Sequence, residues 1–332
     1  MNSQLALERD ASPSGDGQQQ VHPDGSVLAG KSHRIEVCGR GIKVQGRLFR
    51  IARIAGDKYK FLEDPEKLLD GLRKCGKRID LFTFMQRLSD RSPKYSYPME
   101  WENLAALPVT TFENWWNHQI RSYPRNRARQ AEKRGVTFRE MPFDETLVRG
   151  IWEVYNECPV RQGTPFRHFG EDIETVYNAH ATFLDSSIFL GAFLDDGMIG
   201  FAKLVCDETR TQANLMNIVA MIKHKDKAPT NALIAQAVRA CAKRGIRYLV
   251  YQNFSYRKKG QDSLSHFKEV NGFERIEVPR YYVPLTRLGR FALQLGLHHE
   301  IADYVPESVA SRLRRLRAAW YGRKFQSEAH AQ

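Results

Sequence analysis

The sequence predicts an α/β fold in which one mixed sheet is flanked by helices, and three observations carry this prediction. Strand-type and helix-type segments alternate between residues 136 and 285. Within that stretch, two apolar strands joined by Asp195-Asp196-Gly197 indicate a hairpin, so part of the sheet is antiparallel. A helix is predicted over residues 228–245. Its apolar stripe comprises Leu233, Ile234, Ala237, Val238 and Cys241, and Gly245 ends it.

The chain before residue 111 is predicted to hold a tail and a smaller α/β region. Residues 1–32 are rich in Ser, Gly, Gln, Pro and Asp, a composition typical of disorder. Residues 33–54 have strand-type stretches separated by glycine turns. Asp64 followed by Pro65 is typical of a helix N-cap and first-turn proline, and residues 79–86 are a further strand candidate. We therefore treat residues 33–110 as an N-terminal α/β region.

The rest of the chain divides into a main domain over residues 111–286 and a basic helical tail over residues 287–332. A helical segment at 111–135 is expected to break near Pro124. The later elements, besides the hairpin and the helix above, are strands at 136–141, 211–223, 246–253 and 273–285, and helices at 145–158, 171–183, 264–272, 287–300 and 306–322.

Composition limits the class of protein. The 332 residues carry 51 Lys and Arg against 38 Asp and Glu, a net charge of +13, which favours anionic partners such as nucleotides, tRNA, phosphorylated precursors or a membrane face. A charge excess that only keeps the protein soluble is the alternative. No apolar run of about 18 residues is present, and the first residues lack a signal-peptide pattern. Five scattered cysteines complete the pattern expected of a cytoplasmic protein with reduced thiols.

Several motifs for other chemistries are absent or lack their context. Residues 25–32 match the phosphate-binding expression GxxxxGKS, but neither the preceding strand nor the following helix that it needs is predicted. A P-loop nucleotidase therefore stays only a rival reading. No HExxH, paired CxxC or GxSxG occurs, so neither a metal site nor that type of hydrolase is predicted. His298 and His299 are expected at the surface.

The order of elements from residue 136 to 285 resembles the GNAT (acyl-CoA N-acyltransferase) superfamily, and most of all its FemAB-like branch. The resemblance covers about residues 121–285. It rests on the strand 211–223, the turn 225–230, the helix from Asn231, and Phe267-Lys268 before Asn271-Gly272-Phe273. The basic stretch before residue 136 also resembles the one that opens the FemAB-like domain. The resemblance implies a GNAT-like mixed sheet. Whether residues 33–110 form a second, degenerate copy of the same domain stays open.

The resemblance also implies a function. It is transfer of an acyl or aminoacyl group from acyl-CoA or aminoacyl-tRNA, used as co-substrate, to an amine. No tightly bound cofactor is expected. The basic surface would suit an acceptor on a phosphorylated cell-envelope or polysaccharide precursor. The alternative from another class is a non-catalytic basic adaptor that binds tRNA or an anionic membrane.

The donor site is expected where a strand delivers the chain to a loop and the next helix begins. Free N–H groups and the positive end of the helix dipole meet there and favour phosphate. The residues expected to hold the donor are Ile218, Val219, Lys225, Ala228, Thr230 and Asn231. Ala228 and Thr230 stand where the family's loop has small residues, and Pro229 between them has no N–H to donate. An ordinary strand–loop–helix connection is the alternative.

Catalysis of acyl transfer needs an acid for the leaving group and a donor for the oxyanion. The family's tyrosine falls on Lys268, so Tyr256 is our substitute acid, and Asn217 is a polar residue within an apolar strand. A partly buried loop tyrosine and a solvent-facing asparagine are the alternatives.

The acceptor is expected to contact a loop and a basic helix. Glu157, Arg161 and Gln162 offer an acid, a guanidinium and an amide before Gly163, and Arg125 belongs to a run of bases. Ordinary loop chemistry and a solvated charge run are the alternatives. The basic amphipathic pattern at 306–322 leaves peripheral association with an anionic membrane open. All donor assignments require that the strands around Met216 and Val250 diverge.

Overall fold

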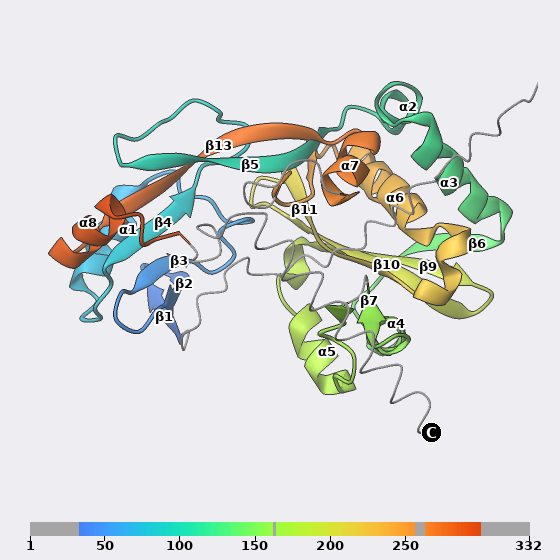
Figure 1. Cartoon of the computed structure of the whole chain (residues 1–332), viewed down its shortest axis with the longest axis horizontal. Coiled ribbons are helices and arrows are strands. Elements are labelled where there is room, and N and C mark those ends of the chain that lie inside the picture. Colours follow the sequence, from blue (N-terminus) through green and yellow to red (C-terminus); the bar gives the residue numbers. More distant parts are fainter. Residues whose placement is uncertain (1–32, 162–163, 256–262, 300–332) are drawn as a thin grey trace, which may run out of the picture.

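In the computed structural model, which describes residues 33–161, 164–255 and 263–299, a sheet of eleven strands runs through the molecule (Figure 1). Its strands, in spatial order, are β1 (His33–Val37), β2 (Arg40–Gln45), β3 (Ile51–Ile54), β4 (Leu81–Met85), β13 (Glu274–Pro284), β5 (Met99–Pro108), β12 (Tyr248–Val250), β11 (Gln212–Ala220), β10 (Gly197–Cys206), β9 (Ser187–Leu194) and β6 (Val136–Met141). A small separate pair joins β7 (Val160–Arg161) to β8 (Thr164–Pro165). The predicted mixed α/β fold is confirmed.

The helices are α1 (Pro65–Lys74), α2 (Phe112–Asn114), α3 (Ser122–Lys133), α4 (Glu145–Asn156), α5 (Ile173–His180), α6 (Pro229–Lys243), α7 (Ser263–Val270) and α8 (Arg287–Gln294). A π-helical turn covers Trp115–Gln119, and 3-10 turns cover Leu184–Ser186 and Ile222–Lys227. None of the described helices is long and apolar enough to span a membrane.

Two strands join an N-terminal lobe (β1–β4, α1 and α8) to a C-terminal lobe (β6–β12 and α2–α7). β5 and β13 run antiparallel from Glu274 opposite Ala106 to Tyr281 opposite Met99. Further along, β13 pairs with β4, from Arg280 opposite Met85 to Pro284 opposite Leu81. Figure 1 shows both strands bridging the space between the lobes. The sheet is therefore continuous across the boundary expected at residue 110.

The N-terminal lobe begins its main helix where the sequence indicates. Asp64 lies in extended backbone and its side chain accepts a hydrogen bond from the Glu66 N–H, while Pro65 occupies the first helical position. Leu68, Leu69 and Leu72 on one face of α1 are buried against the sheet. The predicted N-cap and proline start are thus confirmed.

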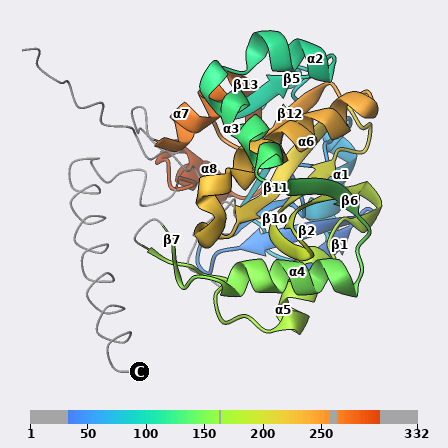
Figure 2. The same cartoon turned by 90° about the vertical axis from the view of Figure 1, so that its right-hand side faces the viewer.

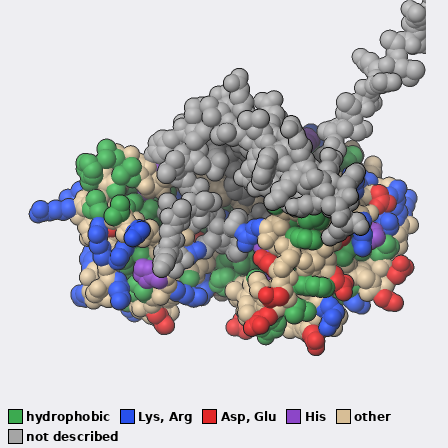
Figure 3. Space-filling model, turned by 60° about the horizontal axis from the view of Figure 1, so that its bottom comes forward, with side chains coloured by type: hydrophobic (Ala, Val, Ile, Leu, Met, Phe, Trp, Pro, Cys, Tyr) green, Lys and Arg blue, Asp and Glu red, His purple; other side chains and the backbone are tan. Residues whose placement is uncertain are grey.

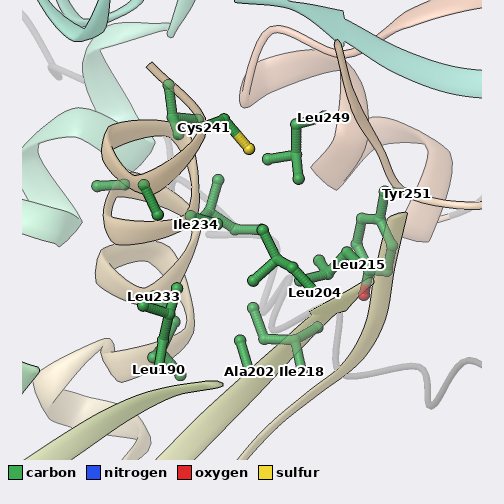
Figure 4. Packing of buried hydrophobic residues seen from close by; sticks show 14 of the residues in the cluster. Leu190, Ala202, Leu204, Leu215, Ile218, Leu233, Ile234, Cys241, Leu249 and Tyr251 are labelled. Carbon is green, nitrogen blue, oxygen red and sulfur yellow. The ribbon is translucent and has the colours of Figure 1, made fainter. Parts of the chain in front are cut away.

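The C-terminal lobe has helices on both faces of its sheet. α3 and α6 cover one face, and α4 and α5 cover the other (Figure 2). In Figure 4, Leu233 of α6 lies beside Leu190, Ile234 points toward Leu204 and Cys241 points toward Leu249. All five residues of the predicted apolar stripe are buried, so the stripe is confirmed. Fully burying one such leucine stabilises the fold by about 2 kcal/mol.

The structure differs from the predictions at four points. β5 was not predicted, because charged and apolar residues mix in its first half, Met99–Asn103. The break expected near Pro124 lies at Ile120–Arg121. Pro124 itself lies in the first turn of α3, where a backbone N–H would have no hydrogen-bond acceptor within the helix, so proline is tolerated there. α8 ends at Gln294 instead of residue 300. His298 is not at the surface, because its side chain is 3% exposed.

Some expectations fall outside the described residues. They are the tail 1–32 with the GxxxxGKS match, the helix at 306–322, Gln162 and Tyr256.

Candidate functional site

The two parallel strands at the centre of the C-terminal lobe pair over only part of their length. β11 pairs with β12 from Gln212 opposite Tyr248 to Asn214 opposite Val250. The remaining six residues of the nine in β11 continue without β12 beside them. The divergence predicted around Met216 and Val250 is therefore confirmed, and it opens toward the carboxyl end of β11.

The strands diverge because the chain after β12 turns toward β5. Gln252 has a left-handed backbone with φ of 49°. The Tyr251 N–H donates to the Ala105 carbonyl at 2.7 Å, and the Ala105 N–H donates to the Gln252 carbonyl at 2.6 Å. Further on, the Ser255 N–H donates to Asn103 Oδ1 at 2.8 Å. β5 thus draws residues 251–255 away from β11.

α6 begins beside the open end of this divergence. Ala228 precedes it with a φ of 55°, the left-handed region that favours glycine, and no side chain caps the helix. Pro229 takes the first helical position, and Thr230 and Asn231 behind it are buried. The first-turn amides and the positive end of the helix dipole are therefore brought to the carboxyl end of β11. Ligands of α/β sheets typically bind at such an end.

The connection between β11 and α6 is braced from the α4 side. Glu157 accepts hydrogen bonds from the N–H groups of Ile222 at 3.0 Å and Lys223 at 2.9 Å. Arg161 is 5% exposed and donates to the carbonyls of Ala220 at 2.7 Å and Val154 at 2.9 Å. These two predicted acceptor residues therefore position the connection between β11 and α6. Their contact with an acceptor stays a prediction.

The same connection is held from α3. Arg127 donates to the Lys225 carbonyl at 2.9 Å, and Arg134 donates to the Asp226 carbonyl at 2.8 Å and pairs with its carboxylate at 3.0 Å. The Lys225 side chain is exposed. Burial, with Lys227 and Lys223 nearby, lowers the pKa of His224. Basic residues thus surround the start of α6, as an anionic donor requires.

Of the predicted catalytic residues, Asn217 and Lys268 lie within the described part of the chain. Asn217 is partly buried and lies in the part of β11 that β12 leaves unpaired, opposite Lys203 of β10. Lys268 is fully buried. Its Nζ donates to the Asn253 carbonyl at 2.5 Å and lies 5.0 Å from the centroid of the Tyr251 ring. Lys268 therefore helps to hold the segment after β12, and the catalytic roles of both residues stay predictions. Arg125 is partly buried in α3.

A buried charge cluster at the lobe junction was missed by the sequence analysis. Arg280 of β13 pairs with Asp57 at 3.0 Å and with Glu102 of β5. Burial acts to raise the pKa of both carboxyls, yet Arg280 holds each pKa below its ordinary value. The Asn253 amide donates to Glu102 at 3.2 Å, so the cluster continues to the segment after β12. The sequence pattern that indicates this cluster is charged residues at every second position of a strand. It becomes visible only once β5 is recognised as a strand.

Charge is distributed unevenly over the molecule. Figure 3 shows one face on which Lys and Arg side chains lie over the N-terminal lobe, whereas Asp and Glu gather on the lobe that carries α4 and α5. On this face, positive side chains therefore lie mainly over the N-terminal lobe, where an anionic partner is favoured.

The comparisons with known proteins place the fold. No family model and no curated protein matches the chain. Three similar solved structures each cover 80% of it. FemX has a TM-score of 0.55 and 12% identity over 90% of its own chain. L-PGS from Bacillus licheniformis has a TM-score of 0.53 and 12% identity over 88%. The third is the C-terminal DUF2156 domain of an Agrobacterium fabrum protein named for lysylphosphatidylglycerol synthetase. It has a TM-score of 0.53 and 17% identity over 88% of its own chain.

The predicted fold is confirmed, since it is like that of FemX and L-PGS. At these identities the likeness concerns the fold.

Proposed function

We propose that the protein transfers an acyl or aminoacyl group from an activated donor to an amine. The observation that carries the proposal is the divergence of β11 from β12 beside an uncapped helix start. The likeness to the Agrobacterium fabrum domain supports it, since the name lysylphosphatidylglycerol synthetase describes attachment of a lysyl group. The donor would enter between the strands with its phosphate against the first turn of α6.

The proposed roles follow the requirements of acyl transfer. The main-chain amides of Thr230 and Asn231, with Lys225, hold donor phosphate beside Ile218, Val219 and Ala228. The acceptor nitrogen attacks the donor carbonyl carbon, the bond to the thiol or hydroxyl leaving group breaks, and an acid protonates that group. Tyr256 or Lys268 supplies this proton and Asn217 donates to the oxyanion.

The acceptor is proposed to be an amine on a phosphorylated cell-envelope or polysaccharide precursor. The net charge of +13 supports an anionic acceptor. Arg125, Arg161, Gln162 and Glu157 are the residues proposed to contact this acceptor. Peripheral association with an anionic membrane would bring the enzyme to such an acceptor.

Donor identity is testable by binding and turnover together. The full chain is screened by thermal shift with acetyl-CoA, longer acyl-CoAs and aminoacyl-tRNA. Any donor that shifts the melting temperature is then offered with radiolabelled acyl group and amine acceptors. We expect one donor class to raise the melting temperature and to be consumed. A shift by tRNA without any transfer would favour the non-catalytic adaptor, and no shift at all would contradict both.

The donor position is testable by charge reversal at the two ends of α6. Thr230→Glu and Lys225→Glu put a carboxylate near the proposed phosphate and are expected to weaken donor binding by tenfold or more, about 1.4 kcal/mol. Lys243→Glu, in the last turn of α6, makes the same charge change as Lys225→Glu at the far end and is its matched control. Because Thr230 is buried and Lys225 is exposed, the second variant separates lost binding from lost folding. Equal donor affinity in all three variants would contradict the proposed donor site at the start of α6.

A further inference from the structure

Three metal-ligating side chains converge at the beginning of β5 and just after α8. Glu100 Oε1 lies 2.9 Å from His298 Nε2 and 3.1 Å from His299 Nε2. The three ligand atoms all lie within 4.8 Å of one another, and the two imidazole rings have centroids 4.0 Å apart. Nearly 200 residues of chain separate the carboxylate from the histidines, so the fold creates this cluster.

The fold holds α8 so that the histidines reach β5. Thr286 caps the helix by accepting from the Gly289 N–H at 3.0 Å, and its hydroxyl donates to Asp80 at 2.8 Å. Gly289 lies so close to the Asp80 carbonyl that an added Cβ would be 1.8 Å from its oxygen. After α8, Gly296 has a φ of 70° and turns the chain back.

The ring of His298 is fixed by packing as well as by Glu100. It lies 4.5 Å from the Tyr282 ring, centroid to centroid. His298 Nδ1 is buried without a hydrogen-bond partner among the described residues. Nothing on that side fixes the tautomer, so Nε2 can face the cluster as a ligand with the proton on Nδ1.

We propose that Glu100, His298 and His299 form a binding site for a divalent transition-metal ion of the Zn²⁺ class. Two imidazoles and a carboxylate are ligands of Zn²⁺, whereas Mg²⁺ and Ca²⁺ require oxygen shells. Bonds of about 2.0–2.1 Å in a tetrahedron place ligand atoms about 3.3 Å apart, close to the two separations from Glu100, 2.9 and 3.1 Å. The exposed fractions are 42% for Glu100 and 37% for His299, so a water molecule can fill the fourth position.

The bound ion would fasten the end of α8 to β5 at the point where the chain continues into residues 300–332. Tyr282 would act as a positioning residue through the ring of His298, on which it packs. This site is separate from the proposed donor site and stands whether or not transfer activity is found.

The test uses the full chain stripped with EDTA and titrated with Zn²⁺ by calorimetry, with Co²⁺ as a spectroscopic probe. We expect one saturable Zn²⁺ site, the absorption of tetrahedral Co²⁺, and a higher melting temperature with Zn²⁺ but not with Mg²⁺. His299→Ala and Glu100→Gln are expected to weaken binding by about tenfold or more. His266→Ala, an exposed histidine on α7, is the matched control and should bind as the wild type does.

His298→Ala is left out of the primary set because that buried ring also packs on Tyr282. Melting curves without metal show whether the two chosen variants fold. Absence of saturable binding would overturn the proposal. Undiminished binding in both folded variants would also overturn it, because the ion would then sit elsewhere, for example on cysteines.

Discussion

At the scale of single residues, Ala228 has a strained backbone conformation in the connection between β11 and α6. Its left-handed backbone costs a residue with a Cβ about 1 kcal/mol, and glycine avoids that cost. We expect Ala228→Gly to stabilise the fold by about 1 kcal/mol in urea unfolding. Ala232→Gly, one turn into the same helix and equally buried, should destabilise it by about 1 kcal/mol. If both variants lose stability alike, Ala228 is not strained.

Lys203 is the residue from which a pH dependence follows. Its Nζ is buried and donates to the carbonyls of His180 at 2.9 Å and Thr182 at 2.7 Å. Burial lowers its pKa from 10.5 to about 8. Between these values the unfolded chain still binds the proton and the folded chain does not. The free energy of unfolding therefore rises as pH increases, by up to about 1.4 kcal/mol per pH unit.

The control for this pH dependence is the Lys203→Met variant, which has no titratable side chain at position 203. Unfolding free energies measured from pH 7 to 10.5 should show the rise in the wild type relative to the variant. Parallel curves for the two proteins would mean that Lys203 keeps an ordinary pKa in the fold.

At the scale of elements, the sequence allowed the C-terminal lobe to be predicted better than the lobe junction. Helix α6 and the β9–β10 hairpin have apolar patterns and turn residues that depend only on neighbours in the chain. β5 does not, since its partners β12 and β13 lie more than 130 residues away. The divergence at β11 was predictable from the order of elements. Its cause, the pull of β5 on Tyr251 and Gln252, was not.

The role of β5 can be tested through Asn103. Its Oδ1 accepts from the Ser255 N–H, and its carbonyl accepts from Phe254 at 3.4 Å. We expect Asn103→Ala to leave the Ser255 amide without its acceptor and to speed its hydrogen exchange about tenfold, equal to about 1.4 kcal/mol. Asn126→Ala, exposed on α3, is the control. Unchanged exchange at Ser255 would show that other contacts hold the segment after β12.

At the scale of the whole molecule, the two lobes share strands, and this decides how the chain can be divided. A cut after residue 110 follows the predicted domain boundary, yet it removes β5 from between β12 and β13 and β4 from the end of β13. The buried pair of Arg280 and Glu102 is then broken, and losing one partner of such a pair costs about 3–5 kcal/mol. That loss is comparable to the whole stability of a domain.

We therefore expect residues 111–332 expressed alone to lack a cooperative melting transition, and co-expression with residues 1–110 to restore it. Arg280→Met in the intact chain is the matched test of the charge cluster and should lower stability by several kcal/mol without abolishing the transition. A sharp calorimetric transition from the isolated 111–332 fragment would contradict this expectation. In that case the C-terminal lobe would carry enough of its own core to close the sheet without β5, and the divergence of β11 from β12 would need another cause.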